Sequence, residues 1–91
     1  MNVFAGDIVY AKAGRDKDTP FVVLEVLDDE YVWLANGRRR KVEKPKKKKI
    51  KHLQKSKYTS LLVQKKLKNG GFVTNPDVKR ALAEILNDHD A

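Results

Sequence analysis

The 91-residue chain contains no cysteine, and no apolar run approaches the ~20 residues that a membrane-spanning helix requires. The missing cysteines exclude a disulfide framework and thiolate metal sites. The two histidines, His52 and His89, lie far apart and lack any ligand spacing, so we expect no zinc site and no cofactor. The first ten residues have neither a basic start nor a long apolar core, unlike a signal peptide. We therefore expect a soluble, cytoplasmic protein with no membrane partner.

Catalytic motifs are also missing from the sequence. It has no phosphate-cradling glycine motif with its lysine, and no nucleophile, base and orienting group can be assigned. The adjacent acids Asp28, Asp29 and Glu30 are typical of a turn. We predict a non-enzyme without a small-molecule substrate. The length allows one small domain, or one domain with an appendage, and we expect a monomer.

Acidic residues are nearly absent from the stretch 38–57, which reads RRRKVEKPKKKKIKHLQKSK. It holds twelve basic residues and one acid, a formal charge of +11, whereas the whole chain carries +8, so the remainder carries −3. This basic band indicates a polyanionic partner, most commonly nucleic-acid phosphate. A solvated run of like charges is the alternative for Lys46–Lys49. Pro45, Val42 and Ile50 tether that run to predicted strands, which favours binding.

Short β-type segments fill the first half of the chain. We predict strands over residues 8–11, 21–27, 31–35, 38–42 and 50–53. Asn36-Gly37 predicts a type I′ hairpin turn into the fourth of these. On that strand Arg38 and Arg40 would point to one side and Arg39 to the other, where they could bind phosphate, protect a sheet edge, or do both. Short strands at this spacing indicate a small barrel or sandwich.

The last third of the chain has a helical pattern. Residues 58–68 predict a short helix that ends at Asn69-Gly70-Gly71. Thr74-Asn75-Pro76-Asp77 predicts the start of a second helix. Its apolar face comprises Val78, Ala81, Leu82, Ile85 and Leu86. We therefore predict a mainly β protein, with a barrel over residues 1–54 and a helical extension over residues 55–91 that packs on it.

Three aromatic residues are expected to share the outer face of the sheet. Tyr10, Tyr31 and Trp33 would point outward if Val9, Ala11, Val32 and Leu34 point inward. Exposed aromatic rings beside basic residues could stack on unpaired bases. The interpretation that we favour is that the C-terminal helices cover them, because the apolar helix face needs a surface to pack against.

The segment from Gly6 to Asp18, GDIVYAKAGRDKD, combines a strand of alternating apolar residues with a glycine and a basic loop. It resembles the KOW motif of ribosomal and transcription-elongation proteins, in which a second apolar strand follows, here 20–27. The run on to Leu53 is similar to small bacterial KOW-domain RNA-binding proteins, which are related to the KOW-type large-subunit ribosomal proteins of archaea and eukaryotes. The resemblance implies an SH3-like five-stranded barrel, here followed by two short C-terminal α-helices, and RNA binding. Asp18 stands where many KOW loops carry a second glycine, which predicts a stiffer loop.

The resemblance also implies that the loop after the first strand contacts RNA, as it does in related proteins. The predicted RNA-binding residues lie in this loop and in the basic band: Lys12, Gly14, Arg15, Lys17, Arg38, Arg39, Arg40, Lys41, Lys44, Lys46, Lys47, Lys48, Lys49 and Lys51. The leading hypothesis is a ribosome-associated protein that contacts large-subunit ribosomal RNA. The alternatives are a KOW-type interaction module of the transcription machinery and non-specific DNA binding.

Overall fold

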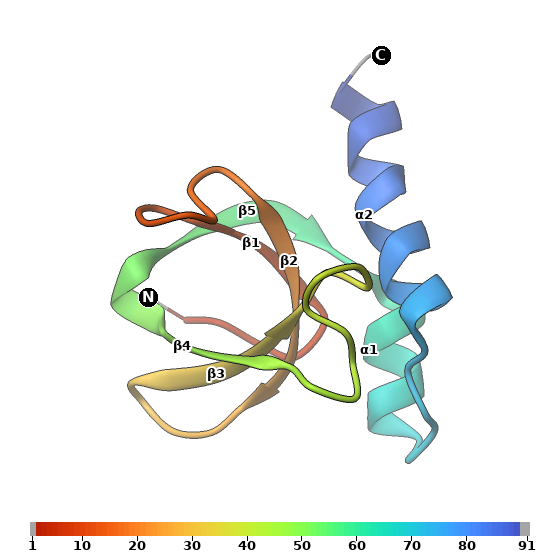
Figure 1. Cartoon of the computed structure of the whole chain (residues 1–91). Coiled ribbons are helices and arrows are strands. Elements are labelled where there is room, and N and C mark those ends of the chain that lie inside the picture. Colours follow the sequence, from red (N-terminus) through yellow and green to blue (C-terminus); the bar gives the residue numbers. More distant parts are fainter. Residues whose placement is uncertain (1, 90–91) are drawn as a thin grey trace.

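Five antiparallel strands form one sheet, and two helices follow it at the C-terminal end (Figure 1). The computed structural model describes residues 2–89, with side chains for residues 2–85. The strands are β1 (Asp7–Ala11), β2 (Pro20–Val26), β3 (Tyr31–Ala35), β4 (Lys46–Lys49) and β5 (Leu53–Thr59), in the sheet order β4-β3-β2-β1-β5. The helices are α1 (Leu61–Lys68) and α2 (Asn75–His89). The predicted number of strands, five, and the two helices predicted after them are therefore confirmed, although two of the strands lie elsewhere than predicted.

The sheet curls around an apolar cluster (Figure 1). The edge strands β4 and β5 are joined by a single 3₁₀ turn, Ile50–His52. The cluster comprises Val3, Val9, Ala11, Phe21, Val23, Val32, Leu34, Ile50 and Leu53. Successive side chains of a strand face opposite sides of the sheet. Val9 and Ala11 of β1 and Val32 and Leu34 of β3 point inward, as predicted.

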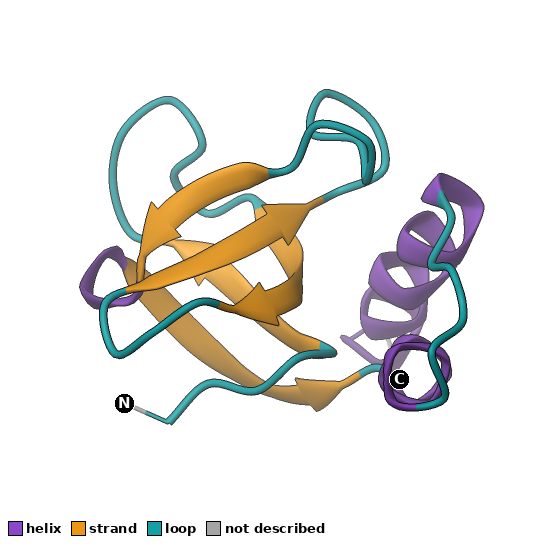
Figure 2. Ribbon diagram, turned by 90° about the horizontal axis from the view of Figure 1, so that it is seen from below, coloured by secondary structure: helices purple, strands orange, loops and turns teal. Residues whose placement is uncertain are grey.

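A second apolar cluster joins the outer face of β1 and β2 to the helices, which lie together on one side of the sheet (Figure 2). Its buried members are Ile8, Val22, Val63, Val78, Ala81 and Ile85. Each face of β2 is thus covered by one of the two clusters, which accounts for the apolar side chains on both of its faces. Leu86, also predicted for the helix face, lies outside the residues whose side chains are described.

Both helices begin with a side-chain cap. The Ser60 hydroxyl accepts a hydrogen bond from the Val63 N–H at 3.2 Å. At the start of α2, the Thr74 hydroxyl accepts from the Asp77 N–H at 3.2 Å, and the Asp77 carboxylate accepts from the Thr74 N–H at 3.0 Å. This reciprocal pair satisfies two backbone donors that would otherwise lack partners.

The predicted strand over residues 38–42 is wrong, and residues 36–45 form a loop that leads to β4. The Asn36 side-chain oxygen accepts the N–H groups of Arg38 and Arg40 at 2.9 and 3.0 Å, so the chain turns back on itself instead of pairing with β3. Gly37 has a φ of +76°, but Asn36 does not have a positive φ, so the turn is not of type I′. Further along this loop, the Val42 N–H donates to the side-chain oxygen of Asn75 at 2.9 Å, which ties the loop to α2.

The predicted fifth strand over residues 50–53 is also misplaced. Ile50–His52 is a 3₁₀ turn, and β5 continues to Thr59, where it pairs with Asp7 of β1. The predicted boundary after residue 54 therefore falls inside a strand, and α1 begins at Leu61 instead of Tyr58. The predicted barrel (1–54) and helical extension (55–91) include residues 1, 90 and 91, which lie outside the described residues.

Candidate nucleic-acid interface

Three basic segments meet where β1 and β3 end and β2 and β4 begin. They surround a hollow of about 500 Å³, which we call the basic hollow; it is lined by Arg15, Asp16, Arg39, Arg40 and Lys46. Arg15 and Asp16 come from the loop between β1 and β2, the two arginines from the loop 36–45, and Lys46 from the first position of β4. The fold thus brings together cations that are up to 31 positions apart in the sequence.

The loop between β1 and β2 is held by its own backbone hydrogen bonds. The N–H groups of Lys17 and Thr19 donate to the carbonyls of Gly14 and Asp16 at 3.2 and 2.9 Å, which makes two successive turns. Gly14 has a φ of +85°, in the left-handed region that glycine adopts without strain. Asp18 has a φ of +66°, a conformation that Asp tolerates better than most residues. The loop therefore has a defined shape, with Arg15 and Lys17 exposed to solvent.

One carboxylate organises the cations of the basic hollow. The Asp16 Oδ2 lies 2.7 Å from the Lys46 Nζ, and this hydrogen-bonded ion pair is the main reason why the pKa of Asp16 is lowered. Arg40 and Arg39 lower the pKa further through their positive charge. Asp16 is therefore ionised at neutral pH and offsets one of the four positive charges, which leaves the hollow with a formal charge of +3. Within residues 2–85, Arg15, Arg39 and Arg40 form no ion pair.

The lysines of β4 alternate between the two sides of the sheet. Lys46 and Lys48 lie opposite Leu34 and Val32, whose side chains point inward. Lys47 and Lys49 are on the outer face, with their Nζ atoms 4.7 and 5.8 Å from the centre of the Tyr31 ring. These distances allow cation–π attraction. The lysine run is therefore an ordered edge strand that presents positive charge on both of its sides.

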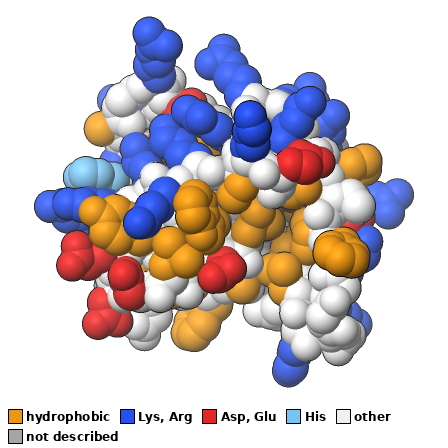
Figure 3. Space-filling view, turned by 60° about the horizontal axis from the view of Figure 1, so that its bottom comes forward, with side chains coloured by type: hydrophobic (Ala, Val, Ile, Leu, Met, Phe, Trp, Pro, Cys, Tyr) orange, Lys and Arg blue, Asp and Glu red, His pale blue; other side chains and the backbone are white. Residues whose placement is uncertain are grey.

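The outer face of β3 is bordered by lysines of β4, which lie over Tyr31, and by an apolar groove at Trp33. Figure 3 shows one face of the molecule, with Lys and Arg side chains crowded above hydrophobic side chains that extend across its middle. Trp33 and Phe72 line a groove that is also lined by Glu25 and Glu43. Two carboxylates make this groove a poor phosphate site. The helices cover Ile8 and Val22, whereas Tyr31 is covered by lysines, so the predicted cover by helices is wrong for Tyr31.

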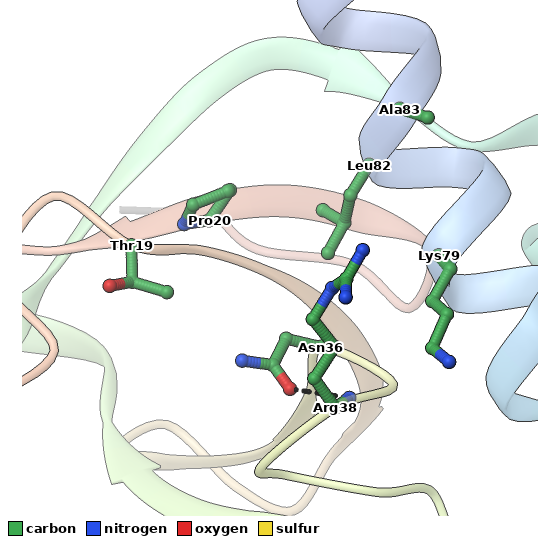
Figure 4. A pocket seen from close by; sticks show the side chains of 7 residues that line it. All are labelled: Thr19, Pro20, Asn36, Arg38, Lys79, Leu82 and Ala83. Carbon is green, nitrogen blue, oxygen red and sulfur yellow. Dashed lines mark hydrogen bonds between the residues drawn. The ribbon is translucent and has the colours of Figure 1, made fainter.

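Several predicted residues lie away from the basic hollow. Arg38 lines a separate pocket against α2, so the predicted grouping of Arg38 with Arg40 is wrong (Figure 4). Lys49 and Lys51 line a third hollow near Asp29 and Glu30. The remaining members line none of these three hollows: Lys12, Gly14, Lys17, Lys41, Lys44, Lys47 and Lys48. The predicted set is thus divided among several places on the surface.

Two residues that the structure places beside predicted cations were not predicted. Asp16 lies within the basic hollow, and its position between Arg15 and Lys17 could have indicated a partner for a distant cation. Lys79 of α2 lies beside Arg38. No sequence pattern indicates Lys79, because its position depends on how α2 packs against the loop 36–45.

Neither the models of known protein families nor the curated proteins contain a match to this chain. Among the described residues, no group of three His, Asp or Glu side chains is arranged to hold a metal ion. In the same part of the chain, neither helix has the length and apolar character needed to cross a membrane. What the chain binds is therefore inferred from its charge and geometry.

Proposed function

We propose that the chain is an RNA-binding protein that contacts large-subunit ribosomal RNA and associates with the ribosome. The observation that carries the proposal is the basic hollow, where Arg15, Arg39, Arg40 and Lys46 converge and Asp16 offsets only one charge. Cations gathered at one place from separate segments favour a ligand with closely spaced negative charges, such as the phosphates of a folded RNA. The choice of ribosomal RNA comes from the KOW resemblance.

The proposed architecture is an SH3-like KOW barrel with a helical extension. The curled five-stranded sheet around one apolar cluster supports it. The positive φ angles at Gly14 and Asp18 support it as well, because they lie where the resemblance places glycines. In this arrangement the loop between β1 and β2 presents Arg15 beside the two arginines of the loop 36–45.

Arginine and lysine would contribute differently to binding. The guanidinium groups of Arg15, Arg39 and Arg40 can each donate two parallel hydrogen bonds to one phosphate, which fixes its orientation. Lys47 and Lys49 would act as point charges along the neighbouring RNA backbone. The expected result is strong, salt-dependent binding with orientation set by the basic hollow.

Binding can be measured with a fragment of large-subunit ribosomal RNA, by fluorescence anisotropy, against a DNA duplex of equal phosphate number. If roughly six to ten phosphates are contacted, affinity should fall by about 10³–10⁵ between about 50 and 200 mM salt. Ribosomal subunits should sediment together with the protein at the lower salt concentration and release it at the higher one. Equal affinity for the DNA would favour non-specific DNA binding instead.

A pair of double variants tests whether the basic hollow is the site. Arg39→Gln with Arg40→Gln removes two charges from the hollow, whereas Lys65→Gln with Lys68→Gln removes two exposed charges from α1, outside it. The first pair should weaken RNA binding much more than the second. Equal losses would mean that only total charge matters, and an unchanged affinity for both would contradict the proposed site.

A further inference from the structure

A small pocket lies between the curled sheet and α2, and we call it the α2 pocket (Figure 4). Its apolar surface is formed by Pro20 of β2 and by Leu82 and Ala83 of α2. Its polar groups are Thr19, Asn36, Arg38 and Lys79. The volume is about 220 Å³. Because pockets for drug-sized ligands measure roughly 300–1,000 Å³, this one suits a single flat ring.

The pocket is preformed because Gly37 fixes α2 against the loop 36–45. A Cβ atom at Gly37 would lie 2.8 Å from the carbonyl oxygen of Asn75 and 3.0 Å from the Cγ atom of Lys79. Such close packing requires glycine there and holds Lys79 at the edge of the pocket. The side-chain oxygen of Asn36 accepts from the Arg38 N–H at 2.9 Å, which fixes the opposite wall.

The polar groups around the pocket are suited to an anion. Arg38 and Lys79 are cations, and among residues 2–85 no Asp or Glu lines the pocket. Since its oxygen is occupied, Asn36 presents its Nδ2 donors, which have no acceptor within the described residues; Figure 4 shows this nitrogen on the side away from the Arg38 backbone. Thr19 adds a hydroxyl. A matching ligand has a negative group, acceptor atoms and a flat body for the apolar surface.

We infer that the α2 pocket binds one unpaired nucleotide of RNA, with its base between the Arg38 guanidinium and the apolar surface of Pro20 and Leu82, and its phosphate at Lys79. The inference rests on the proposed function. Arg38 is directly followed in the chain by Arg39 and Arg40 of the basic hollow, so one RNA strand can contact both places. This continuity favours RNA over an acidic peptide. Splayed-out bases are also the usual targets of sequence-selective RNA recognition, and they stack on guanidinium planes.

The test uses two hairpin RNAs that differ only in one unpaired adenosine bulge. The bulged hairpin should bind about tenfold more tightly, which is the effect of roughly one stacked base. The variant Ala83→Leu should abolish this preference by filling the pocket, while affinity for the plain hairpin stays the same. Ala83 is exposed and leucine is a good helix former, so the variant should fold. The matched control Ala83→Ser keeps the pocket open and should keep the preference.

A second pair of variants tests the phosphate contact. Lys79→Gln should reduce the preference for the bulge, whereas Arg80→Gln, the neighbouring exposed cation outside the pocket, should weaken both hairpins equally. A 2-aminopurine in place of the bulged adenosine should change its fluorescence on binding to the parent and not to Ala83→Leu. These two readouts separate a nucleotide in the pocket from general attraction to phosphate.

The outcomes distinguish this inference from the proposed function. Equal, salt-dependent affinity of the parent for both hairpins would overturn the nucleotide pocket and leave RNA binding intact. No binding to either hairpin or to ribosomal RNA would overturn both. If a glutamate-rich peptide shifts the Leu82 and Ala83 methyl signals and the bulged hairpin does not, the pocket belongs to a protein partner and the inference is wrong.

Discussion

The Lys46 Nζ lies 2.7 Å from the Asp16 Oδ2, which joins the first residue of β4 to the loop between β1 and β2. The pair anchors that loop beside Arg39 and Arg40 and consumes one of the four cations of the basic hollow. Asp16 therefore has two opposing effects, since it positions the loop and also repels phosphate.

The variant Asp16→Asn separates these effects. It removes the negative charge and releases Lys46, so RNA affinity at low salt should rise. The slope of log affinity against log salt should become steeper by about one, as expected for one additional phosphate contact. Salt titrations of the parent and the variant measure both quantities. A weaker affinity with an unchanged slope would mean that Asp16 acts mainly by holding the loop.

Asp77 makes the start of α2 sensitive to pH. Its pKa is lowered mainly by the hydrogen bond from Lys66, at 2.6 Å, and further by the Thr74 N–H. Because the folded pKa lies below the ordinary value of 3.8, the carboxylate stabilises the fold above that value, and its contribution is lost as the pH falls through the folded pKa. Asp77→Asn retains a capping oxygen and removes the charge. It should melt below the parent at neutral pH, and the difference should shrink as the pH falls below 3.8 and through the folded pKa. A constant difference across this range would contradict the ionic role.

Two glycines with similar backbone angles provide a matched test of packing. Gly14 and Gly37 have φ angles of +85° and +76°, but a Cβ atom at Gly14 would meet no atom within 4 Å, whereas one at Gly37 would lie 2.8 Å from Asn75. Alanine at either position carries the cost of a positive φ, on the order of 1–3 kcal/mol. Gly37→Ala should cost more than Gly14→Ala, because it also displaces α2. Urea denaturation of the two variants measures the difference, and equal costs would show that α2 adapts freely.

The helices should contribute to stability through their buried side chains. Ile85 is 4% exposed in the cluster between the sheet and α2, so Ile85→Ala should lower the free energy of unfolding by about 2–4 kcal/mol. Leu61 of α1 is 65% exposed, and Leu61→Ala should change it little. Thermal or urea denaturation checks both. A negligible effect of Ile85→Ala would mean that α2 does not add to the stability of the isolated chain.

The parts of the fold that the sequence predicted are those with an apolar pattern. Strands β1 to β3 alternate or are apolar throughout, and α2 has an apolar stripe with a capping pair. Strand β4 is four lysines and β5 reads LQKSKYT, so neither has an apolar period. They form strands because β4 pairs with β3 and β5 pairs with β1. This pairing depends on the tertiary structure, which local residue preferences do not encode.

The candidate site was predicted as separate pieces. The charge count and the KOW resemblance indicated the loop and the arginines, but their meeting depends on the turn that the Asn36 side chain imposes on residues 36–40. That turn sends Arg38 toward α2 and the next two arginines toward Asp16. A strand with alternating side chains would instead have placed Arg38 and Arg40 on one side and Arg39 on the other.

The structure gives Arg15 and Lys17 different positions relative to the basic hollow, although both were predicted from the sequence to bind RNA in the same way. Both are exposed in the loop between β1 and β2, but only Arg15 lines the basic hollow. Arg15→Ala should therefore cause most of the loss in RNA affinity that the double variant Arg15→Ala with Lys17→Ala shows, and Lys17→Ala alone should cause a small loss that salt removes. Part of the Arg15 contribution should persist at high salt, because oriented hydrogen bonds are screened less than point charges. Neither change should affect thermal stability, since neither side chain forms an ion pair within residues 2–85. Equal losses from the two single variants would mean that the loop acts only as a diffuse positive charge, and that its shape plays no part in recognition.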